Sequence, residues 1–254
     1  MELECLRLEP GGRVVRVTFA RPHVLNAMHY ATILELERVV DWLGQDAASR
    51  VVVITGAGRS FSTGIDLKEL AAGESPFEYH EHFERALRGL EMLPKIVIAA
   101  INGWCLGGGL QLALACDIRA ASAEAQLGLP AIKESLIPGL STFRLPRYVG
   151  MGWAKRLVLG GENLPAEVAQ RIGLVDYVFP AETFPAEIER LVEHYLSAAS
   201  EGARLSKLLL NRGPDLDHAA FLAEYFSLQR QAQSGHDFFE AQRAYLEGRM
   251  PVWE

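Results

Sequence analysis

Cysteine is scarce in this sequence, and the spacing of the three that occur excludes a cross-linked or zinc-bound scaffold. Cys5, Cys105 and Cys116 form no CxxC pair, whereas disulfide frameworks and zinc sites need clustered thiols or thiols paired with histidines. Cys105 and Cys116 lie within apolar runs, where a lone cysteine usually serves as a small buried residue. We therefore expect no disulfide framework and no metal ion.

Long apolar runs and an excess of basic residues are also missing. No window approaches the ~18 uncharged apolar residues of a membrane-spanning helix. The N-terminal stretch MELECLRLEPGGRVVRVTF is charged and alternating, unlike a signal or transit peptide. The net charge is -7, whereas nucleic acids and anionic membranes attract basic proteins. We expect a cytoplasmic protein with no nucleic-acid or membrane partner.

What the sequence has is the composition and alternation of a soluble α/β protein. Hydrophobic residues make up 49% of its 254 residues, which suits one large domain. Short β-branched runs alternate with amphipathic helical patterns, and this alternation predicts a core with parallel strands. Strands are predicted at 13–22, 50–58, 95–103 and 117–122, and helices at 30–43, 75–93 and 107–116. Ser75 is the expected N-cap of the helix at 75–93, with Pro76 at its first position.

Helices predominate toward the C-terminus. Residues 164–180 predict a short helix that stops at Gly173 and a last strand. Residues 185–249 predict helices, with a break at NRGPDLD (211–217). We divide the chain into an α/β core over residues 1–195 and a helical part over residues 196–254.

Two glycine-rich junctions between strand and helix suggest the chemistry. In LGGGLQLALACD (106–117), three glycines open an apolar helix, which leaves unpaired N–H groups at its positive end. Such an end suits an anion or a polarised carbonyl oxygen. Alternatively, the glycines only permit close packing of strand and helix. The run is neither GxGxxG nor a Walker loop, because the glycine spacing differs from both and no lysine follows.

The second junction, VVVITGAGRSFSTGIDLKEL (51–70), has the same character. A strand and a glycine loop lead into Gly64-Ile65-Asp66 at the start of a possible helix. Two backbone donors from separate turns are what an oxyanion hole for a thioester requires. No GxSxG motif accompanies the serines, so a serine hydrolase is not predicted.

With both junctions in place, the chain resembles the enoyl-CoA hydratase/isomerase family, the crotonase superfamily. The resemblance covers essentially the whole chain, with the segments in family order. They are RPHVLNAM (21–28), VVITGAGRSFSTGIDLKEL (52–70), NGWCLGGGLQLALACDIRAAS (102–122), LGLPAIKESLIPGLSTFRLPRYVG (127–150), RIGLVDYVFP (171–180) and FFEAQRAYLEGRMPVW (238–253).

The resemblance implies an α/β crotonase (ClpP-like) fold, a spiral of ββα turns whose helical C-terminal part builds a homotrimer or a dimer of trimers. It implies a lyase or isomerase that acts on an acyl-CoA thioester and needs no cofactor beyond the CoA of its substrate. The thioester carbonyl would lie between the backbone N–H groups of Ile65 and Gly108, which would stabilise an enolate.

The resemblance also assigns contacts to the substrate. CoA is expected to run past Leu25, Ala27, Asp66, Leu67 and Lys68. Lys68 would pair with a phosphate, or is a solvated surface residue. Lys207 occupies a region from which the family often reaches a CoA phosphate. Trp104, beside the GGG turn, would line the acyl pocket or belong to the core.

The chain departs from the family where protons are moved. Family hydratases use two glutamates to add water across a double bond, and the corresponding residues here are Gln111 and Ala131. A glutamine cannot act as a base near neutral pH, and an alanine does no proton chemistry. Because one general acid or base is worth about 10²–10⁴ in rate, ordinary hydration is expected to be severely impaired.

Three other side chains are candidate substitutes. Glu134 follows Ala131 by three residues, and His80 and Glu84 lie in FEYHEHFERA (77–86) on the helix that borders the acyl pocket in this family. Each of the three is alternatively a solvated surface residue. Two hypotheses therefore stand. The chain is an enzyme that isomerises, decarboxylates or hydrolyses through a thioester enolate, or it is a catalytically silent acyl-CoA-binding protein.

Overall fold

The computed structural model describes residues 2–198 and 200–253, and a six-stranded sheet forms the centre of its core. Its strands, in spatial order, are β1 (Leu6–Gly11), β2 (Val14–Phe19), β3 (Val51–Gly56), β5 (Ile96–Ile101), β7 (Ile118–Ser122) and β10 (Tyr177–Phe179). β1 and β2 form an antiparallel hairpin, and the remaining neighbours pair in parallel, with Val53 opposite Ile98 in the middle. The predicted parallel core is confirmed.

The chain also forms a smaller sheet of four strands. It consists of β4 (Ser60–Ser62), β6 (Trp104–Leu106), β8 (Gln126–Gly128) and β9 (Asn163–Pro165). Along the chain β3 is followed by β4, β5 by β6 and β7 by β8, and each pair leads into a helical segment. Three successive ββα turns result, which confirms the crotonase spiral. The sequence shows no clean repeat because the turns share geometry rather than residues.

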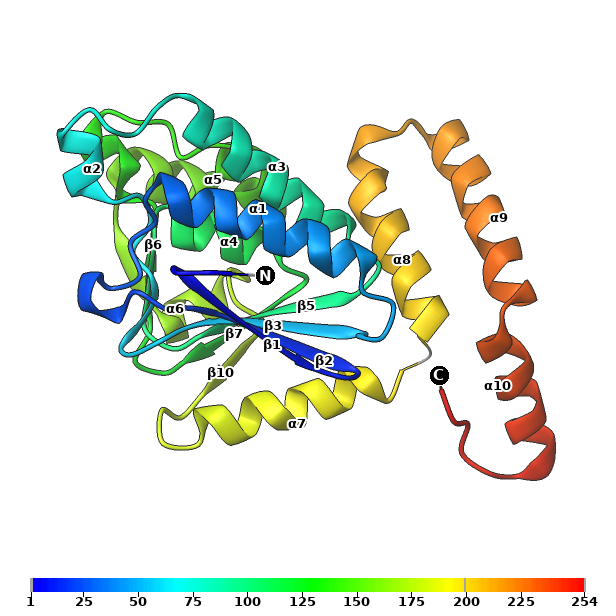
Figure 1. The fold of residues 1–254 in the computed structure, drawn as a ribbon. Helices are drawn as coiled ribbons and strands as arrows, with labels where there is room; N and C mark the ends of the chain where they lie inside the picture. Colours follow the sequence, from blue (N-terminus) through cyan, green and yellow to red (C-terminus); the bar gives the residue numbers. More distant parts are fainter. Residues whose placement is uncertain (1, 199, 254) are drawn as a thin grey trace.

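Helices cover both faces of the large sheet (Figure 1). On one face lie α1 (Tyr30–Gln45), α3 (Glu78–Met92), α4 (Gly108–Ala115) and α5 (Ser141–Gly160). On the other face α7 (Phe184–Leu196) packs Ile188 and Val192 against Val51 and Ile98. Four short helices complete the core: η1 (Pro22–Val24), α2 (Leu67–Ala71), η2 (Pro130–Glu134) and α6 (Ala166–Arg171).

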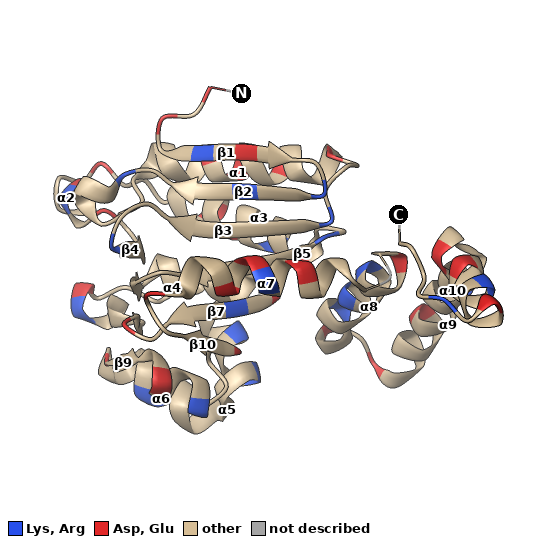
Figure 2. Cartoon of the chain, turned by 90° about the horizontal axis from the view of Figure 1, so that it is seen from below, with Lys and Arg blue, Asp and Glu red and all other residues tan. Residues whose placement is uncertain are grey.

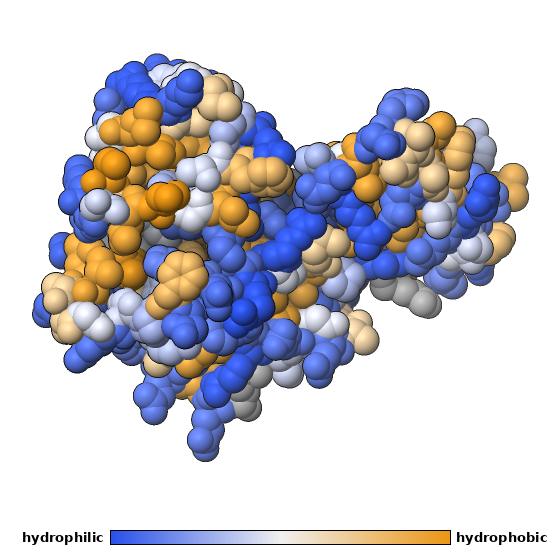
Figure 3. All heavy atoms as spheres, turned by 90° about the horizontal axis from the view of Figure 1, so that it is seen from above, coloured by the Kyte–Doolittle hydropathy of each residue, from blue (hydrophilic) through white to orange (hydrophobic). Residues whose placement is uncertain are grey.

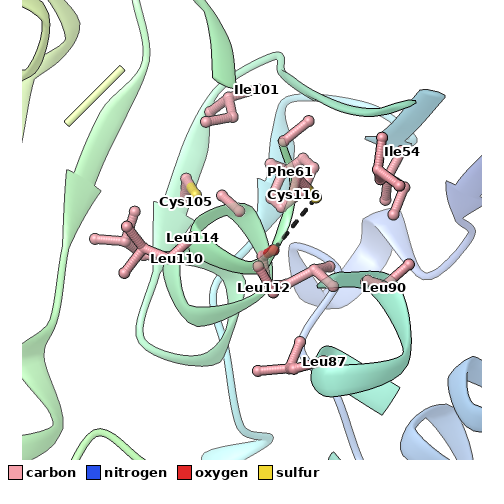
Figure 4. Close-up of a cluster of buried hydrophobic side chains, with 14 of the residues drawn as sticks. Ile54, Phe61, Leu87, Leu90, Ile101, Cys105, Leu110, Leu112, Leu114 and Cys116 are labelled. Atoms are coloured by element: carbon pink, nitrogen blue, oxygen red, sulfur yellow. Dashed lines mark hydrogen bonds between the residues drawn. The ribbon is translucent and has the colours of Figure 1, made fainter. Parts of the chain in front are cut away.

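The apolar helix α4 is buried on nearly every side. Leu110, Leu112 and Leu114 all lie within the core, and Figure 4 shows them among side chains from α3 and the neighbouring strands. The Cys116 thiol donates to the Leu112 carbonyl over 3.3 Å. Burial raises the pKa of this thiol to about 12, so Cys116 is an inert core residue, as predicted.

The last helices form an arm beside the core (Figure 1). It consists of α8 (Ser200–Arg212), η3 (Gly213–Asp215), α9 (His218–Ser234) and α10 (His236–Glu247), which confirms the helical prediction for this region. Figure 2 shows charged residues on the arm and on α7, and none on β3 or β5. The division of the chain at residue 195 stays a prediction. No helix among residues 2–198 and 200–253 is long and apolar enough to cross a bilayer.

One predicted helix start is wrong. The helix predicted from Ser75 begins at Glu78, and Phe77 occupies its N-cap position without a side-chain cap. The carbonyls of Pro76 and Phe77 accept the N–H groups of Tyr79 and His80, so a tight turn precedes the helix. Ser75 lies before that turn and its hydroxyl has no hydrogen-bond partner.

Candidate active site

The two glycine turns meet, because each follows a strand of the same sheet. β4 and β6 pair in parallel, so the segments that leave their carboxyl ends are adjacent. Gly64 has a φ of +89°, and a Cβ at this position would stand 2.6 Å from the backbone nitrogen of Gly108. Only glycine therefore allows this contact between the two turns.

Each turn leaves one backbone donor available. The Met28 N–H donates to the Gly64 carbonyl over 2.7 Å, and the Met28 carbonyl accepts from the Asp66 N–H over 3.0 Å. The N–H of Ile65, which lies opposite Met28, takes part in neither bond. Gly108 is the first residue of α4, and its N–H has no acceptor within the helix. Neither N–H has an acceptor elsewhere in the described chain.

Both donors line a partly open space, here called the inner pocket, of about 80 Å³. Its wall includes seven residues predicted from the sequence: Ile65, Leu67, His80, Gly108, Gln111, Ala131 and Glu134. Apolar side chains from α3 and from the loop after η2 also line it, among them Phe83 and Leu136. The structure therefore brings together both backbone donors, both positions that lack a glutamate and two of the three candidate substitutes.

Glu134 stands close to the place where a carboxylate is missing. Ala131 and Glu134 belong to the 3₁₀-helix η2, in which residues three apart lie directly above one another. Glu134 forms no hydrogen bond or ion pair with any described residue. Across the pocket, the His80 ring contacts the rings of Phe77 and Tyr79 and is likewise without an ion pair in the described structure. These are the two titratable groups of the pocket wall besides Tyr79.

Tyr79 is not a base at neutral pH. Burial raises the pKa of its phenol, and the hydroxyl donates to the Met28 carbonyl over 3.2 Å. This bond fixes α3 to the strand-like segment that carries the Ile65 turn. The phenol therefore has a structural role in the pocket wall.

Glu84, the third candidate substitute, lies outside the pocket wall. Its carboxylate accepts from the Leu140 N–H over 2.8 Å and pairs with Arg144 over 2.9 Å. The prediction that it replaces a missing base does not fit these contacts. Its neighbour on α3, His82, pairs instead with Glu37 over 2.5 Å.

A second depression, here called the outer groove, adjoins the inner pocket and shares Thr63, Ile65, Leu67 and Pro130 with it. Five of the six residues predicted to contact CoA line this groove, namely Leu25, Ala27, Asp66, Leu67 and Lys68, and Lys207 does not. His23 and Arg59 also line it and were missed. Their signal was present, since His23 lies within the matching segment 21–28 and Arg59 within the matching segment 52–70.

The outer groove is built on strained but well-fixed backbone. Leu25 and Asn26 both have a φ in the left-handed region, at 55° and 56°. The Asn26 amide donates to the carbonyls of Ala57 and Ser60, which holds the loop against the first glycine turn. Asp66 caps α2 through the Lys68 N–H and pairs with Arg21 over 3.4 Å. These contacts of Asn26 and Asp66 make this wall of the outer groove rigid.

Two predicted contacts are corrected by the structure. The Lys207 ammonium is buried, where it pairs with Asp117 over 2.8 Å and donates to the carbonyls of Leu90 and Lys95. It therefore ties α8 to the core and is not free for a phosphate. Trp104 is 38% exposed on β6 and lines neither the inner pocket nor the outer groove, because the strand's pleat turns Cys105 inward instead.

Among the described residues, no group of three His, Cys, Asp or Glu side chains is arranged to hold a metal ion. The site as it stands consists of two backbone donors, a glutamine, a carboxylate and an imidazole around a small apolar space.

Comparisons with known proteins agree with this geometry. The family model Enoyl-CoA hydratase/isomerase matches residues 9–254. The chain is 38% identical to the Short-chain-enoyl-CoA hydratase of Clostridium acetobutylicum, over 98% of this chain and 97% of that protein. It is 36% identical to the Crotonyl-CoA hydratase of Syntrophomonas wolfei with the same coverage.

Solved structures lead to the same family. An enoyl-CoA hydratase from Bacillus anthracis matches with a TM-score of 0.93 and 32% identity, covering 98% of this chain and 99% of that one. One from Mycobacterium smegmatis matches with a TM-score of 0.92 and 28% identity, covering 99% of each chain. Fold, full-length family match and identity above 30% agree, and the chain belongs to the enoyl-CoA hydratase/isomerase family.

Proposed function

We propose that this protein binds an acyl-CoA thioester with CoA along the outer groove and the acyl group in the inner pocket. The observation that carries the proposal is the pair of unpaired N–H groups, on Ile65 and Gly108, in turns that contact each other at the pocket wall. Two such donors stabilise the negative charge of a thioester enolate without a metal or redox cofactor.

The reaction best supported is proton transfer at the α-carbon, not addition of water. The relatives are named hydratases, but Gln111 and Ala131 leave this pocket without the two glutamates that hydration uses in the family. Glu134 and His80 remain in the pocket wall as side chains of the types that act as general acids and bases. If the acyl group carries a β,γ double bond, removal of an α-proton gives a dienolate, and return of a proton to the γ-carbon moves the double bond to the α,β position, which is an isomerisation.

We expect a short acyl group. The inner pocket is small, with a volume of about 80 Å³, and a long acyl chain would have to leave it. Phe83, which is buried, forms part of its wall. We expect acetyl- and butyryl-CoA to bind more tightly than decanoyl-CoA.

A second candidate function is a silent acyl-CoA binder. The absence of a carboxylate from positions 111 and 131 favours it, because the backbone donors alone bind a thioester without moving a proton. Exchange of the α-protons of butyryl-CoA in D₂O separates the two, because it needs one base and an enolate but no particular product. Exchange well above that of free butyryl-CoA supports the enzyme; tight binding without exchange establishes the binder.

We also propose a homotrimer as the working assembly. Large apolar side chains are exposed on α5, the arm and the C-terminal segment, among them Phe143, Leu159, Phe239, Leu246 and Met250. Figure 3 shows apolar surface on both the core and the arm. Monomers rarely expose so much. Light scattering after gel filtration tests this: three times the chain mass of 28.0 kDa is expected, and a monomer would contradict it.

A further inference from the structure

Glu84 belongs to a partly buried ionic network on α3 and α5, the helices that carry Glu84, Glu91 and Arg144. Its carboxylate accepts from the Leu140 N–H and from Arg144, and Arg144 also pairs with Glu91 over 2.6 Å. The Arg144 side chain is only 6% exposed. Although burial opposes its charge, the two carboxylates raise the pKa of Arg144. Glu84 is therefore held in one place as a carboxylate partner.

The Gln111 amide lies next to this carboxylate. A Cβ on Gly139 would stand 2.5 Å from the Oε1 of Gln111 and 2.6 Å from the Oε1 of Glu84. The two side chains therefore both end within 3 Å of one point beside Gly139. Gly139 has a φ of +46°, which favours glycine. A side chain at this position would also collide with Gln111 and Glu84.

A carboxylate at position 111 would be unfavourable at this place. Two carboxylates that share a site repel each other, and one of them must take up a proton. An amide carries no charge, and turning it about its Cγ–Cδ bond exchanges Oε1 for Nε2. The Nε2 group can then donate to the Glu84 carboxylate.

We propose that Glu84 is a positioning residue that fixes the Gln111 amide with Nε2 toward Glu84 and Oε1 toward the inner pocket. Glutamine at position 111 adds no second negative charge beside Glu84, whose carboxylate pairs with Arg144.

The assignment has a chemical consequence that rests on the proposed function. An Oε1 directed at the acyl group accepts a hydrogen bond from a water or a substrate hydroxyl, as a glutamate would. It cannot remove a proton. Gln111 can therefore orient a water or a substrate hydroxyl as a glutamate would, but another group must transfer the proton.

The test uses thermal unfolding and needs no substrate. In Gln111→Glu the new carboxyl lies beside Glu84, so its pKa in the folded state rises above that of the unfolded chain. The folded state then binds the proton more tightly, and stability falls as pH rises through this interval. Between pH 5 and 8 we expect the melting temperature of Gln111→Glu to fall relative to the parent by about 3 °C for each unit of pKa shift.

The second change identifies the neighbour. Glu84→Gln in the same chain should remove most of the fall, because the neutral amide still accepts from Leu140 and Arg144. Glu78→Gln is the matched control: Glu78 lies on the same helix but is exposed and has no partner among the described residues, so the fall should persist. An unchanged fall in the Glu84 variant, or no fall at all, overturns the proposal.

If Gln111→Glu does not fold, a cycle between Gln111→Met and Glu84→Gln replaces it. Methionine keeps the length of the side chain without its donor, so the two changes should be non-additive in melting temperature, while Gln111→Met and Glu78→Gln should add. Additivity in both cycles also overturns the proposal. Failure of the proposed function is seen separately, as absence of acyl-CoA binding or of α-proton exchange in the parent.

Discussion

The Cα of Gly64 lies against the backbone nitrogen of Gly108, and a Cβ at position 64 would stand 2.6 Å from it. This contact joins two turns that come from segments 44 residues apart. It sets the separation of the two backbone donors, on Ile65 and Gly108, and so determines whether one carbonyl oxygen reaches both.

The first prediction is that Gly64→Ala weakens butyryl-CoA binding at least tenfold and lowers any turnover by about 10²–10³, the loss typical of one oxyanion donor. The new methyl group must push the two turns apart. Titration calorimetry measures the binding. Gly12→Ala is the matched control, because Gly12 also has a positive φ, at +67°, but nothing lies within 4 Å of its Cβ position. Equal effects of the two changes would mean that backbone strain alone causes the loss, and would contradict a role for the contact between Gly64 and Gly108.

The second prediction concerns the missing glutamates. The parent should hydrate crotonyl-CoA poorly, and Gln111→Glu together with Ala131→Glu should raise the rate, because both positions face the same pocket as the donors. Each single change should do much less, since the two carboxylates act on one water as a unit. Loss of the enoyl thioester absorbance follows the reaction.

Glu84 modifies this prediction. Because it lies beside position 111, the new glutamate should work best when Glu84→Gln is added. A parent as fast as an ordinary hydratase would contradict the account and would direct attention to Glu134 and His80.

The third prediction tests the corrected role of Lys207. Removing one partner of a buried ion pair costs about 3–5 kcal/mol, so Lys207→Met should be strongly destabilised, with little change in the KM for the acyl-CoA of the folded fraction. Urea unfolding and kinetics measure the two effects. A normal stability with a raised KM would restore the phosphate contact.

The loss of stability in Lys207→Met should also depend on pH. Burial raises the pKa of Asp117, and Lys207 opposes this rise. Without the lysine the folded-state pKa climbs further above that of the unfolded chain, so the folded state holds the proton more tightly. The variant should therefore lose more stability relative to the parent at pH 8 than at pH 5. A constant difference would mean that Asp117 does not respond to the ammonium.

The sequence predicted the parts of the site that depend on short segments. Glycines at 64 and 107–109 could be read directly, because only backbone without side chains exposes donors at a strand-to-helix turn. Gln111 and Ala131 were recognised by their offset from these glycines and from Pro130. Five of the six residues predicted to contact CoA come from two matching segments, and the structure brings these five together in the outer groove.

Contacts between distant segments could not be predicted in this way. The pairing of Glu84 with Arg144 joins residues 60 positions apart, and Lys207 meets the Leu90 carbonyl across 117 positions. A charged side chain in an amphipathic helix looks the same whether it faces water or a buried partner. Trp104 was misplaced because a three-residue strand gives too little alternation to fix its pleat.

The central claim is that the N–H of Gly108 polarises the thioester carbonyl, and exchange of the α-protons of butyryl-CoA in D₂O tests it most directly. Gly108→Pro removes the N–H at the first position of α4, where proline fits a helix. Gly108→Ala keeps the N–H and adds a Cβ that meets only the flexible end of Met28 within 3 Å. We predict exchange in the parent, most of it retained in the alanine variant, and loss of at least 10² in a folded proline variant. Equal exchange in the proline and alanine variants would contradict the account.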